Sequence, residues 1–298
     1  MTGTAAKRPD AVLIAGPTAS GKSALALEFA QALDGVVVNA DSMQVYDALT
    51  ILTARPDADE MAGIEHRLYG HVAAERDYSV AAWLKDAAAA LADIRASGKT
   101  AIFTGGTGLY FKALEEGLSP MPAIDQAIRE HWRSVAQARP QDLHGALKAR
   151  DPDAAAALNA SDTQRLVRAL EVFDATGRSI LAWQQERRQG GALAGLDVGK
   201  WLISPDRGVL RERIGRRVDM MIEMGAVDEV KTLLARGLSP RLPVMRAIGV
   251  PQIAAFLRGE IERDEAIERI GIATRQYAKR QMTWFRNQTN SQWQVRPG

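Results

Sequence analysis

The stretch Ala11-Val12-Leu13-Ile14-Ala15-Gly16-Pro17-Thr18-Ala19-Ser20-Gly21-Lys22-Ser23 decides the fold of this chain. Its first five residues form an apolar run before turn residues, which is typical of a buried parallel strand. The next eight match G-x-x-x-x-G-K-[ST], a loop that leads from a strand into a helix. Backbone N–H groups of such a loop turn inward toward an anion, and the helix points its positive end at the same place. We therefore predict a P-loop that binds a di- or triphosphate.

The composition is that of an ordinary globular protein. With 298 residues, the chain is long enough for one large α/β domain or two linked ones. Its hydrophobic content of 46% and charged content of 25% are typical of soluble proteins. The lack of cysteine excludes disulfides and thiolate zinc sites. The N-terminal apolar run is too short for a signal peptide or a membrane span, so we expect a cytoplasmic protein without membrane contact.

Basic residues are concentrated at the C-terminal end. From Arg269 onward the chain has six basic residues and no acidic one, although the net charge of the whole chain is only +2. Arg275 and Lys279 lie four residues apart on a helix predicted over 264–286, which also carries aromatic residues. Basic and aromatic residues on one helix favour contact with nucleic acid, but the aromatics can equally be core residues, as we expect for Trp284. This end of the chain therefore predicts a polyanionic partner.

Two further strands are expected to end beside the P-loop. Residues 35–40 and 100–104 are apolar and rich in β-branched residues, and they lead into Asp41 and into the glycine turn that holds Thr107. Because parallel strands place ligands beyond their carboxyl ends, both side chains should share a cleft with the P-loop. Asp41 is then a magnesium ligand, a general base or a cap of the next turn. Thr107 either donates to a phosphate oxygen or caps its helix, while Ser42 and Gln44 offer hydrogen bonds to a base edge.

The middle of the chain predicts a helical insertion. After Pro120 and Pro122, short amphipathic segments follow one another without a convincing strand until Trp201. We expect helices over 125–138, 141–149, 151–158, 162–175 and 180–188. The predicted parts are a P-loop core over 1–118, the insertion over 119–198 and a return to the core over 199–298. Arginines of the insertion, such as Arg129 and Arg168, either form a binding face or a plain solvated surface.

A second pair of arginines is expected to face the phosphate. Arg213 and Arg217 lie one turn apart on a helix that begins near Asp206, so they share a face. Two guanidinium groups can bridge the oxygens of a diphosphate bidentately. This pattern favours a diphosphate as the ligand of the cleft.

Taken together, these motifs resemble the tRNA dimethylallyltransferases (tRNA isopentenyltransferases) of the bacterial type without a zinc finger, over nearly the whole chain. The resemblance is carried by six stretches in the right order, which are 16–23, 41–46, 105–110, 165–172, 213–219 and 274–285. A P-loop kinase would share only the first. The chain departs from the family pattern at Leu52, Arg55 and Val250, which the family usually fills with glycine, lysine and tyrosine.

The resemblance implies an enzyme that transfers a dimethylallyl group from dimethylallyl diphosphate to N6 of adenine at tRNA position 37, beside the anticodon. It implies an α/β fold with a P-loop NTPase-like core, a parallel sheet and an all-helical insertion that binds tRNA, with the target base flipped into a channel. Mg²⁺ on Ser23 would be the cofactor, and the enzyme is expected to be a monomer. Asp41 would accept the N6 proton, Thr107 would touch the bridging region, and Lys22 and Arg217 would neutralise the leaving group.

The site residues carried over from the resemblance fall into three sets. The catalytic set is Asp41, Thr107, Lys22 and Arg217. The diphosphate set is Gly16, Pro17, Thr18, Ala19, Ser20, Gly21, Lys22, Ser23, Arg213 and Arg217. The tRNA set is Asp41, Ser42, Met43, Gln44, Thr107, Arg129, Gln164, Arg165, Leu166, Val167, Arg168, Arg275 and Lys279. Two alternatives remain: a small-molecule or nucleotide kinase whose arginine helix serves as a lid, and a nucleic-acid-binding module without catalysis.

Overall fold

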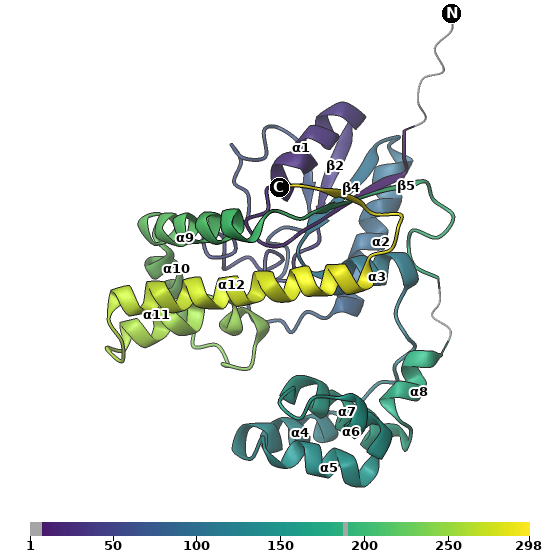
Figure 1. Ribbon diagram of the computed structural model, residues 1–298, viewed down its shortest axis with the longest axis vertical. Helices are drawn as coiled ribbons and strands as arrows, with labels where there is room; N and C mark the ends of the chain where they lie inside the picture. Colours follow the sequence, from purple (N-terminus) through teal and green to yellow (C-terminus); the bar gives the residue numbers. More distant parts are fainter. Residues whose placement is uncertain (1–7, 187–189) are drawn as a thin grey trace, which may run out of the picture. The chain divides into compact units, whose positions relative to one another are not determined.

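A computed structural model describes residues 8–186 and 190–298 (Figure 1). These residues divide into two compact units. The first contains the described residues up to Glu115 together with Ala192–Gly298, and the second is Glu116–Gly191. The first unit has the predicted α/β fold with a parallel sheet.

The sheet of the first unit has six parallel strands. They are β1 (Ala11–Ala15), β2 (Gly35–Asn39), β3 (His66–Arg67), β4 (Thr100–Gly105), β5 (Val198–Ile203) and β6 (Gln294–Arg296), in the order β3-β2-β4-β1-β5-β6. Every residue of β1 is fully buried. Because β1 lies between β4 and β5, the loop that follows it begins near the middle of the sheet edge.

Alternate residues of β1 pack on opposite faces of the sheet. Val12 and Ile14 join a cluster with Leu25 of α1 (Lys22–Leu33), while Leu13 joins the larger core with Trp83 of α2 (Val80–Ala96). The other helices of this unit are α3 (Gly108–Glu116), α9 (Arg207–Glu223), α10 (Ala226–Ala235), α11 (Val250–Leu257) and α12 (Arg263–Gln288), with a 3₁₀ turn at Pro243–Arg246. A strand covered on both faces must be apolar throughout, which explains the continuous hydrophobic run of β1.

The second unit is all-helical around its own core. It contains α4 (Gln126–Ala138), α5 (Asp142–Arg150), α6 (Pro152–Ala157), α7 (Thr163–Thr176) and α8 (Ile180–Gln185). Acidic or serine side chains cap four of these helices by accepting a backbone N–H, for example Asp162 from Arg165 at 3.2 Å. Trp132, Leu143 and Leu170 lie in its core. All five predicted helices are present, although the predicted end of the last one, at Arg188, lies outside the described residues.

The predicted insertion, 119–198, overlaps the second unit but extends too far at its C-terminal end. Leu193 is buried in the core of the first unit, and its N–H donates to the Leu114 carbonyl at 3.2 Å. The chain therefore joins the first unit at Ala192, before β5 begins at Val198. The short strands β3 and β6 and the helices α10 and α11 were not predicted.

Candidate functional site

The P-loop connects β1 to α1 through a turn with two left-handed residues. Ala19 has φ 61° and Gly21 has φ 90°. The Ser20 N–H donates to the Pro17 carbonyl at 3.3 Å, which closes the turn. Within the described chain no side chain caps α1, so its first N–H groups are left for another acceptor. The loop therefore has the geometry of an anion site at a helix N-terminus.

A polar pocket lies against this loop in the first unit. Its lining residues are Thr18, Lys22, Ser23, Asp41, Gln44, Thr53, Ala54, Tyr69, Thr104 and Arg217. Six of the ten belong to the predicted site, and they come from the P-loop, α1, the segment after β2 and α9. Thr53, Ala54, Tyr69 and Thr104 were not predicted. Tyr69 follows a strand of only two residues, and Thr104 lies inside a strand, where the sequence does not mark it as a site residue.

Two cations dominate the charge of the pocket. The Lys22 Nζ donates to the Pro17 carbonyl at 3.2 Å, and an Arg217 N–H donates to Thr18 Oγ1 at 3.2 Å. Burial lowers the pKa of Lys22 to about 8; the charge of Asp41 opposes this shift, and the charge of Arg217 adds to it. Burial also lowers the pKa of Arg217. Burial therefore disfavours the charged form of both groups, and an anion bound in the pocket would favour it.

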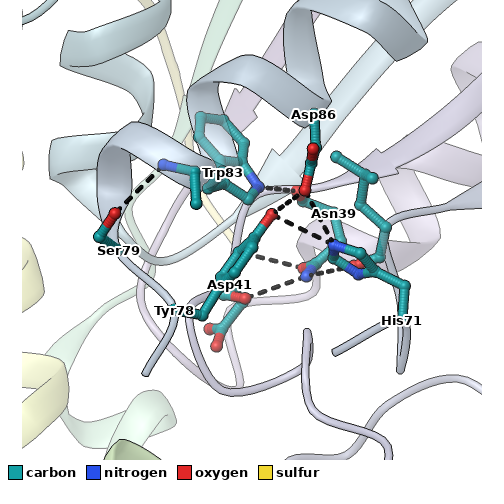
Figure 2. Close-up of polar contacts among 9 residues, drawn as sticks. Asn39, Asp41, His71, Tyr78, Ser79, Trp83 and Asp86 are labelled. Atoms are coloured by element: carbon teal, nitrogen blue, oxygen red, sulfur yellow. Dashed lines mark hydrogen bonds and ion pairs between the residues drawn. The ribbon is translucent and has the colours of Figure 1, made fainter. Parts of the chain in front are cut away.

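The backbone of Asp41 is fixed by the buried side chain of Asn39 (Figure 2). Asn39 Oδ1 accepts the Asp41 N–H at 2.8 Å, and Asn39 Nδ2 donates to the carbonyls of Asp41 and Leu68, both at 3.0 Å. Trp83 Nε1 donates to the Asn39 carbonyl at 3.0 Å. The Asp41 backbone is thus tied to β2 and α2, which holds the carboxylate at the pocket.

The Asp41 carboxylate does cap the next turn, as one of the three interpretations expected. Its Oδ1 accepts the Met43 N–H at 2.9 Å. This uses one lone pair of a group that can accept about four hydrogen bonds. The negative charge also acts on the pocket, because it raises the pKa of Tyr69 together with burial, and it opposes the fall of the Lys22 pKa. Capping therefore leaves acceptor capacity for a ligand.

A polar cluster supports the same region from α2. The Tyr78 hydroxyl donates to Asp86 Oδ2 at 2.6 Å and lies 3.2 Å from His71 Nε2 (Figure 2). Burial lowers the pKa of His71, so this imidazole is neutral at pH 7. The cluster ties the segment after β3 to the first turns of α2.

Thr107 joins the two strand-end segments. Its Oγ1 accepts the Ser42 N–H at 2.9 Å and lies 3.3 Å from Ser42 Oγ. Thr107 is not among the pocket-lining residues. Tyr277 of α12 also forms a side-chain hydrogen bond with Thr107. In this structure, Thr107 connects the segment after β2 to α3 and α12.

Gln281 of α12 connects the P-loop to the second glycine turn. It is buried, its Oε1 accepts the Thr18 N–H at 3.0 Å, and its Nε2 donates to the Gly106 carbonyl at 2.9 Å. A Cβ atom on Gly106 would lie 2.1 Å from Gln281 Nε2, and one on Gly108 would lie 2.1 Å from the Trp284 ring. These glycines therefore allow α12 to approach closely, and Trp284 is a half-buried core neighbour as expected.

The side-chain amide of Gln44 is occupied within the protein. Its Nε2 donates to the carbonyls of Thr53 and Ala54 at 2.9 and 2.8 Å, which leaves the side-chain oxygen as an acceptor. The donor group of Gln44 thus supports the 50–55 loop, and the contact of Gln44 with a base edge stays a prediction. Glu229 holds the same loop by accepting three backbone N–H groups at 2.6, 2.8 and 3.0 Å.

The three departures from the family pattern are accommodated by packing. The Leu52 side chain packs on Gly249, and a Cβ atom added to Gly249 would lie 2.6 Å from Leu52 Cδ2. Arg55 donates from Nη1 to the Tyr46 carbonyl at 2.8 Å and from Nη2 to Thr50 Oγ1 at 2.6 Å, so both nitrogens of its fork are used. Val250 is buried.

Several other predicted residues lie outside the pocket lining. Arg213 is half-buried one turn before Arg217 on α9 and does not line the pocket. Ser42 and Met43 occupy the turn after Asp41 without lining the pocket. On α12, Arg275 is half-buried and Lys279 is exposed.

The remaining predicted tRNA residues belong to the second unit. Leu166 is fully buried in its core, so its assignment to a binding surface was wrong, and Val167 packs against the same core. The reason is that consecutive helical residues point about 100° apart. Gln164 is exposed, Arg165 pairs with Asp162 at 3.3 Å, and Arg168 pairs with the buried Glu171 at 3.4 Å. Arg129 is half-buried on α4, and its Nε has no hydrogen-bond partner among the described residues.

This geometry suits a reaction with an anionic leaving group. The helix N-terminus, Lys22 and Arg217 can neutralise a diphosphate, while Asp41 is the only carboxylate among the lining residues. A lone carboxylate beside such a leaving group can accept a proton from an incoming nucleophile.

Comparisons with known proteins agree with one another. The family model described as IPP transferase matches residues 44–288, and the one described as isopentenyl transferase matches residues 9–76. A tRNA dimethylallyltransferase of Rhizobium etli is 56% identical over 96% of each chain. One of Rhizobium meliloti is 54% identical over 96% of this chain and 94% of the other.

Two solved structures of similar proteins have names from the same family. A tRNA isopentenylpyrophosphate transferase from Bacillus halodurans is 35% identical, covering 97% of this chain and 90% of that one, with a TM-score of 0.69. A eukaryotic dimethylallyltransferase acting on tRNA is 29% identical, covering 92% of this chain and 69% of that one, with a TM-score of 0.76.

Proposed function

The chain belongs to the IPP transferase family, the tRNA dimethylallyltransferases, which transfer a dimethylallyl group to adenine in tRNA, and we propose how its own residues perform this transfer. The donor is dimethylallyl diphosphate, and the acceptor is N6 of the adenine at position 37, beside the anticodon. The observation that carries this proposal is the single pocket that holds Lys22, Arg217 and Asp41 at the edge of the parallel sheet.

The diphosphate of the donor binds at the P-loop. Lys22 and Ser23 at the start of α1 line the pocket together with Arg217 of α9, and no side chain among the described residues caps the first N–H groups of α1. Charge grows on the bridging oxygen as the C–O bond of the donor breaks, so these groups interact more strongly in the transition state than in the ground state. The P-loop thus stabilises a leaving diphosphate rather than a transferred phosphoryl group.

The donor set of the pocket fits a magnesium ion that arrives with the diphosphate. Mg²⁺ commonly uses one or two protein ligands together with phosphate oxygens and water. The Ser23 hydroxyl lines the pocket, and the described residues contain no cluster of three acidic or histidine side chains that would hold an ion by itself. When bound, the ion would supply positive charge to the leaving diphosphate.

Asp41 is the general base of the transfer. A new bond forms between N6 and the allylic carbon, and the carbon–oxygen bond to diphosphate breaks. The N6 proton becomes acidic during this attack and passes to the Asp41 carboxylate, while the electron pair of the broken bond leaves with the diphosphate. Oδ1 already accepts the Met43 N–H, which holds the carboxylate in one orientation.

Two basic surfaces hold the tRNA, each on its own unit. In the first unit, Arg275 and Lys279 of α12 contact the phosphate backbone. In the second unit, the contacts come from exposed or half-buried side chains of α4 and α7, namely Arg129, Gln164, Arg165 and Arg168.

We further propose that the enzyme acts as a monomer in the cytoplasm. No helix in the described part of the chain is long and apolar enough to cross a membrane.

Labelled substrates test the proposal directly. The enzyme is incubated with tRNA and either dimethylallyl diphosphate labelled in its dimethylallyl group or ATP labelled in its γ-phosphate. Label is expected in the tRNA only from dimethylallyl diphosphate. Phosphorylation of any acceptor with loss of prenyl transfer would revive the kinase alternative, which the comparisons do not favour. Tight tRNA binding without either transfer would indicate a binding module.

Binding of tRNA is expected to lose part of its salt dependence in an Arg275→Ala/Lys279→Ala variant. Each phosphate contact releases counterions, so removing two contacts should make the slope of log affinity against log salt shallower by about 1–2. Filter binding from 50 to 300 mM salt measures the slope. A matched control, Arg95→Ala/Arg258→Ala, removes two arginines that pair with Asp10 and Glu260. Equal slopes in the test variant and the native enzyme would remove α12 from the tRNA surface.

Diphosphate binding is expected to weaken as the pH rises above 8. The folded pKa of Lys22 is about 8, so the ammonium fraction falls from roughly nine-tenths at pH 7 to one-tenth at pH 9. Pyrophosphate affinity should therefore fall about tenfold more in the native enzyme than in Lys22→Ala, which corrects for titration of the ligand itself. Calorimetry at pH 7, 8 and 9 gives the ratio. A constant ratio would show that the Lys22 charge does not meet the ligand.

A further inference from the structure

One buried hydroxyl of the pocket has no partner in the protein. Thr104 is the penultimate residue of β4 and pairs in register with Ile14 of β1, the strand that leads into the P-loop. The residue is 4% exposed and lines the pocket with Lys22 and Arg217. Its Oγ1 forms no hydrogen bond with any of the described residues. The backbone is satisfied, since the Thr104 carbonyl accepts the Ala40 N–H at 2.8 Å.

A buried hydroxyl without a partner indicates a group that is absent from the protein itself. Buried side-chain polar atoms are nearly always paired, because an unpaired one keeps its full desolvation penalty. Lys22 and Arg217, which line the same pocket, can only donate hydrogen bonds. A diphosphate oxygen is negatively charged and accepts hydrogen bonds, so it would satisfy the threonine O–H and the two cationic groups together.

We propose that the Thr104 hydroxyl donates a hydrogen bond to an oxygen of the bound diphosphate, which makes Thr104 a binding residue for the prenyl donor. This inference rests on the proposed function, in which the pocket holds the diphosphate. The fold does not need the hydroxyl, since valine has the same branched shape and suits a buried strand at least as well. The hydroxyl would therefore contact the ligand from the β4 side of the pocket.

The same strand offers a matched control. Thr100, the first residue of β4, is 1% exposed, but its hydroxyl already donates to the Pro9 carbonyl at 3.0 Å. Thr100→Val removes a satisfied hydroxyl away from the pocket, whereas Thr104→Val removes an unsatisfied one within it. Thr104→Ser keeps the hydroxyl and loses only a methyl group.

The test combines calorimetry with thermal unfolding, using inorganic pyrophosphate and Mg²⁺ as the probe. Thr104→Val is expected to bind pyrophosphate about tenfold more weakly, which corresponds to about 1.4 kcal/mol. Thr104→Ser should bind within about twofold of the native enzyme. Without ligand, the thermal unfolding midpoint of Thr104→Val should equal that of the native enzyme or lie about 1–3 °C above it. Adding pyrophosphate should raise the midpoint of Thr104→Val less than that of the native enzyme. Thr100→Val should show the reverse, with a lower midpoint and native affinity.

Three outcomes would decide against parts of this account. Native pyrophosphate affinity in Thr104→Val, together with lost affinity in Lys22→Ala, would overturn the role of Thr104 and leave the diphosphate site in place. A lower midpoint of unliganded Thr104→Val would overturn it too, because the hydroxyl would then have a partner within the protein. Native affinity in Lys22→Ala would overturn the proposed diphosphate site itself.

Discussion

Single-turnover transfer by Asp41→Asn is expected to be slower than transfer by the native enzyme by roughly 10²–10⁴-fold. The exocyclic amine of adenine is a weak nucleophile because its lone pair is delocalised into the ring. A base that accepts the proton during attack lowers the barrier mainly in the transition state, so its loss reduces the rate rather than ground-state binding.

Asparagine is the informative replacement because it preserves the local structure. Its side-chain oxygen can still accept the Met43 N–H, and its backbone can still pair with Asn39, but it cannot take a proton. Pyrophosphate affinity should change little, since Lys22 and Arg217 remain. Asp47→Asn is the control: its carboxylate accepts the Ala74 N–H at 3.1 Å, and it does not line the pocket. Rescue by excess Mg²⁺, or a parallel loss of pyrophosphate affinity, would make Asp41 a metal-site residue instead.

Transfer by Lys22→Ala is expected to fall by roughly 10²–10³-fold, while tRNA affinity stays close to that of the native enzyme. Lys22 lines the pocket of the first unit, and in the proposed mechanism its ammonium neutralises charge that develops on the leaving diphosphate. The folded state should not suffer. Because the pKa of Lys22 is about 8 when folded and 10.5 when unfolded, the protonated group opposes folding at neutral pH, and its contribution to the free energy of unfolding rises between pH 8 and 10.5.

Rate, tRNA affinity and thermal midpoint are measured on the same preparation. Lys99→Ala removes a half-buried lysine that pairs with Glu65 and does not line the pocket, so this variant should behave as the native enzyme in all three measurements. If Lys22→Ala remained folded but lost tRNA affinity as strongly as rate, the nucleic acid rather than the diphosphate would lie on the P-loop. Omitting Mg²⁺ from the native enzyme should likewise slow transfer without weakening tRNA binding.

The parts of the fold with a strong local pattern could be predicted from the sequence. β1 is a continuous apolar run beside a motif that requires a strand before it and a helix after it, and α1 begins at Lys22 as expected. The helices of the second unit begin at local signals such as Asp125 and Ser179, whose side chains accept the first free N–H groups. β3 and β6 have only two and three residues, so neither is long enough to show a hydrophobic pattern typical of a strand.

Residues of the candidate site could be predicted only where a reactive or charged side chain belongs to a recognisable local motif. Lys22 and Asp41 could be placed because they follow strand ends that must share one sheet edge. Thr104 could not, because the sequence does not show whether a buried hydroxyl has a partner. Gln281 lies 263 positions from Thr18, whose backbone N–H donates to the Gln281 side chain, and no local pattern predicts such a pairing. Leu166 was misplaced because a contiguous motif was read as one surface.

The link between Gln281 and the P-loop has a consequence for how the enzyme is made. A ribosome that adds 5–20 residues per second needs about 13–50 s to travel from Thr18 to Gln281. During that interval β1 and α1 can form, but the Thr18 N–H lacks its acceptor and the Gly106 carbonyl lacks its donor. Nascent chains interrupted before α12 would therefore have a P-loop without its hydrogen bond to Gln281. Under the proposed function, the site for the prenyl donor would be complete only late in translation.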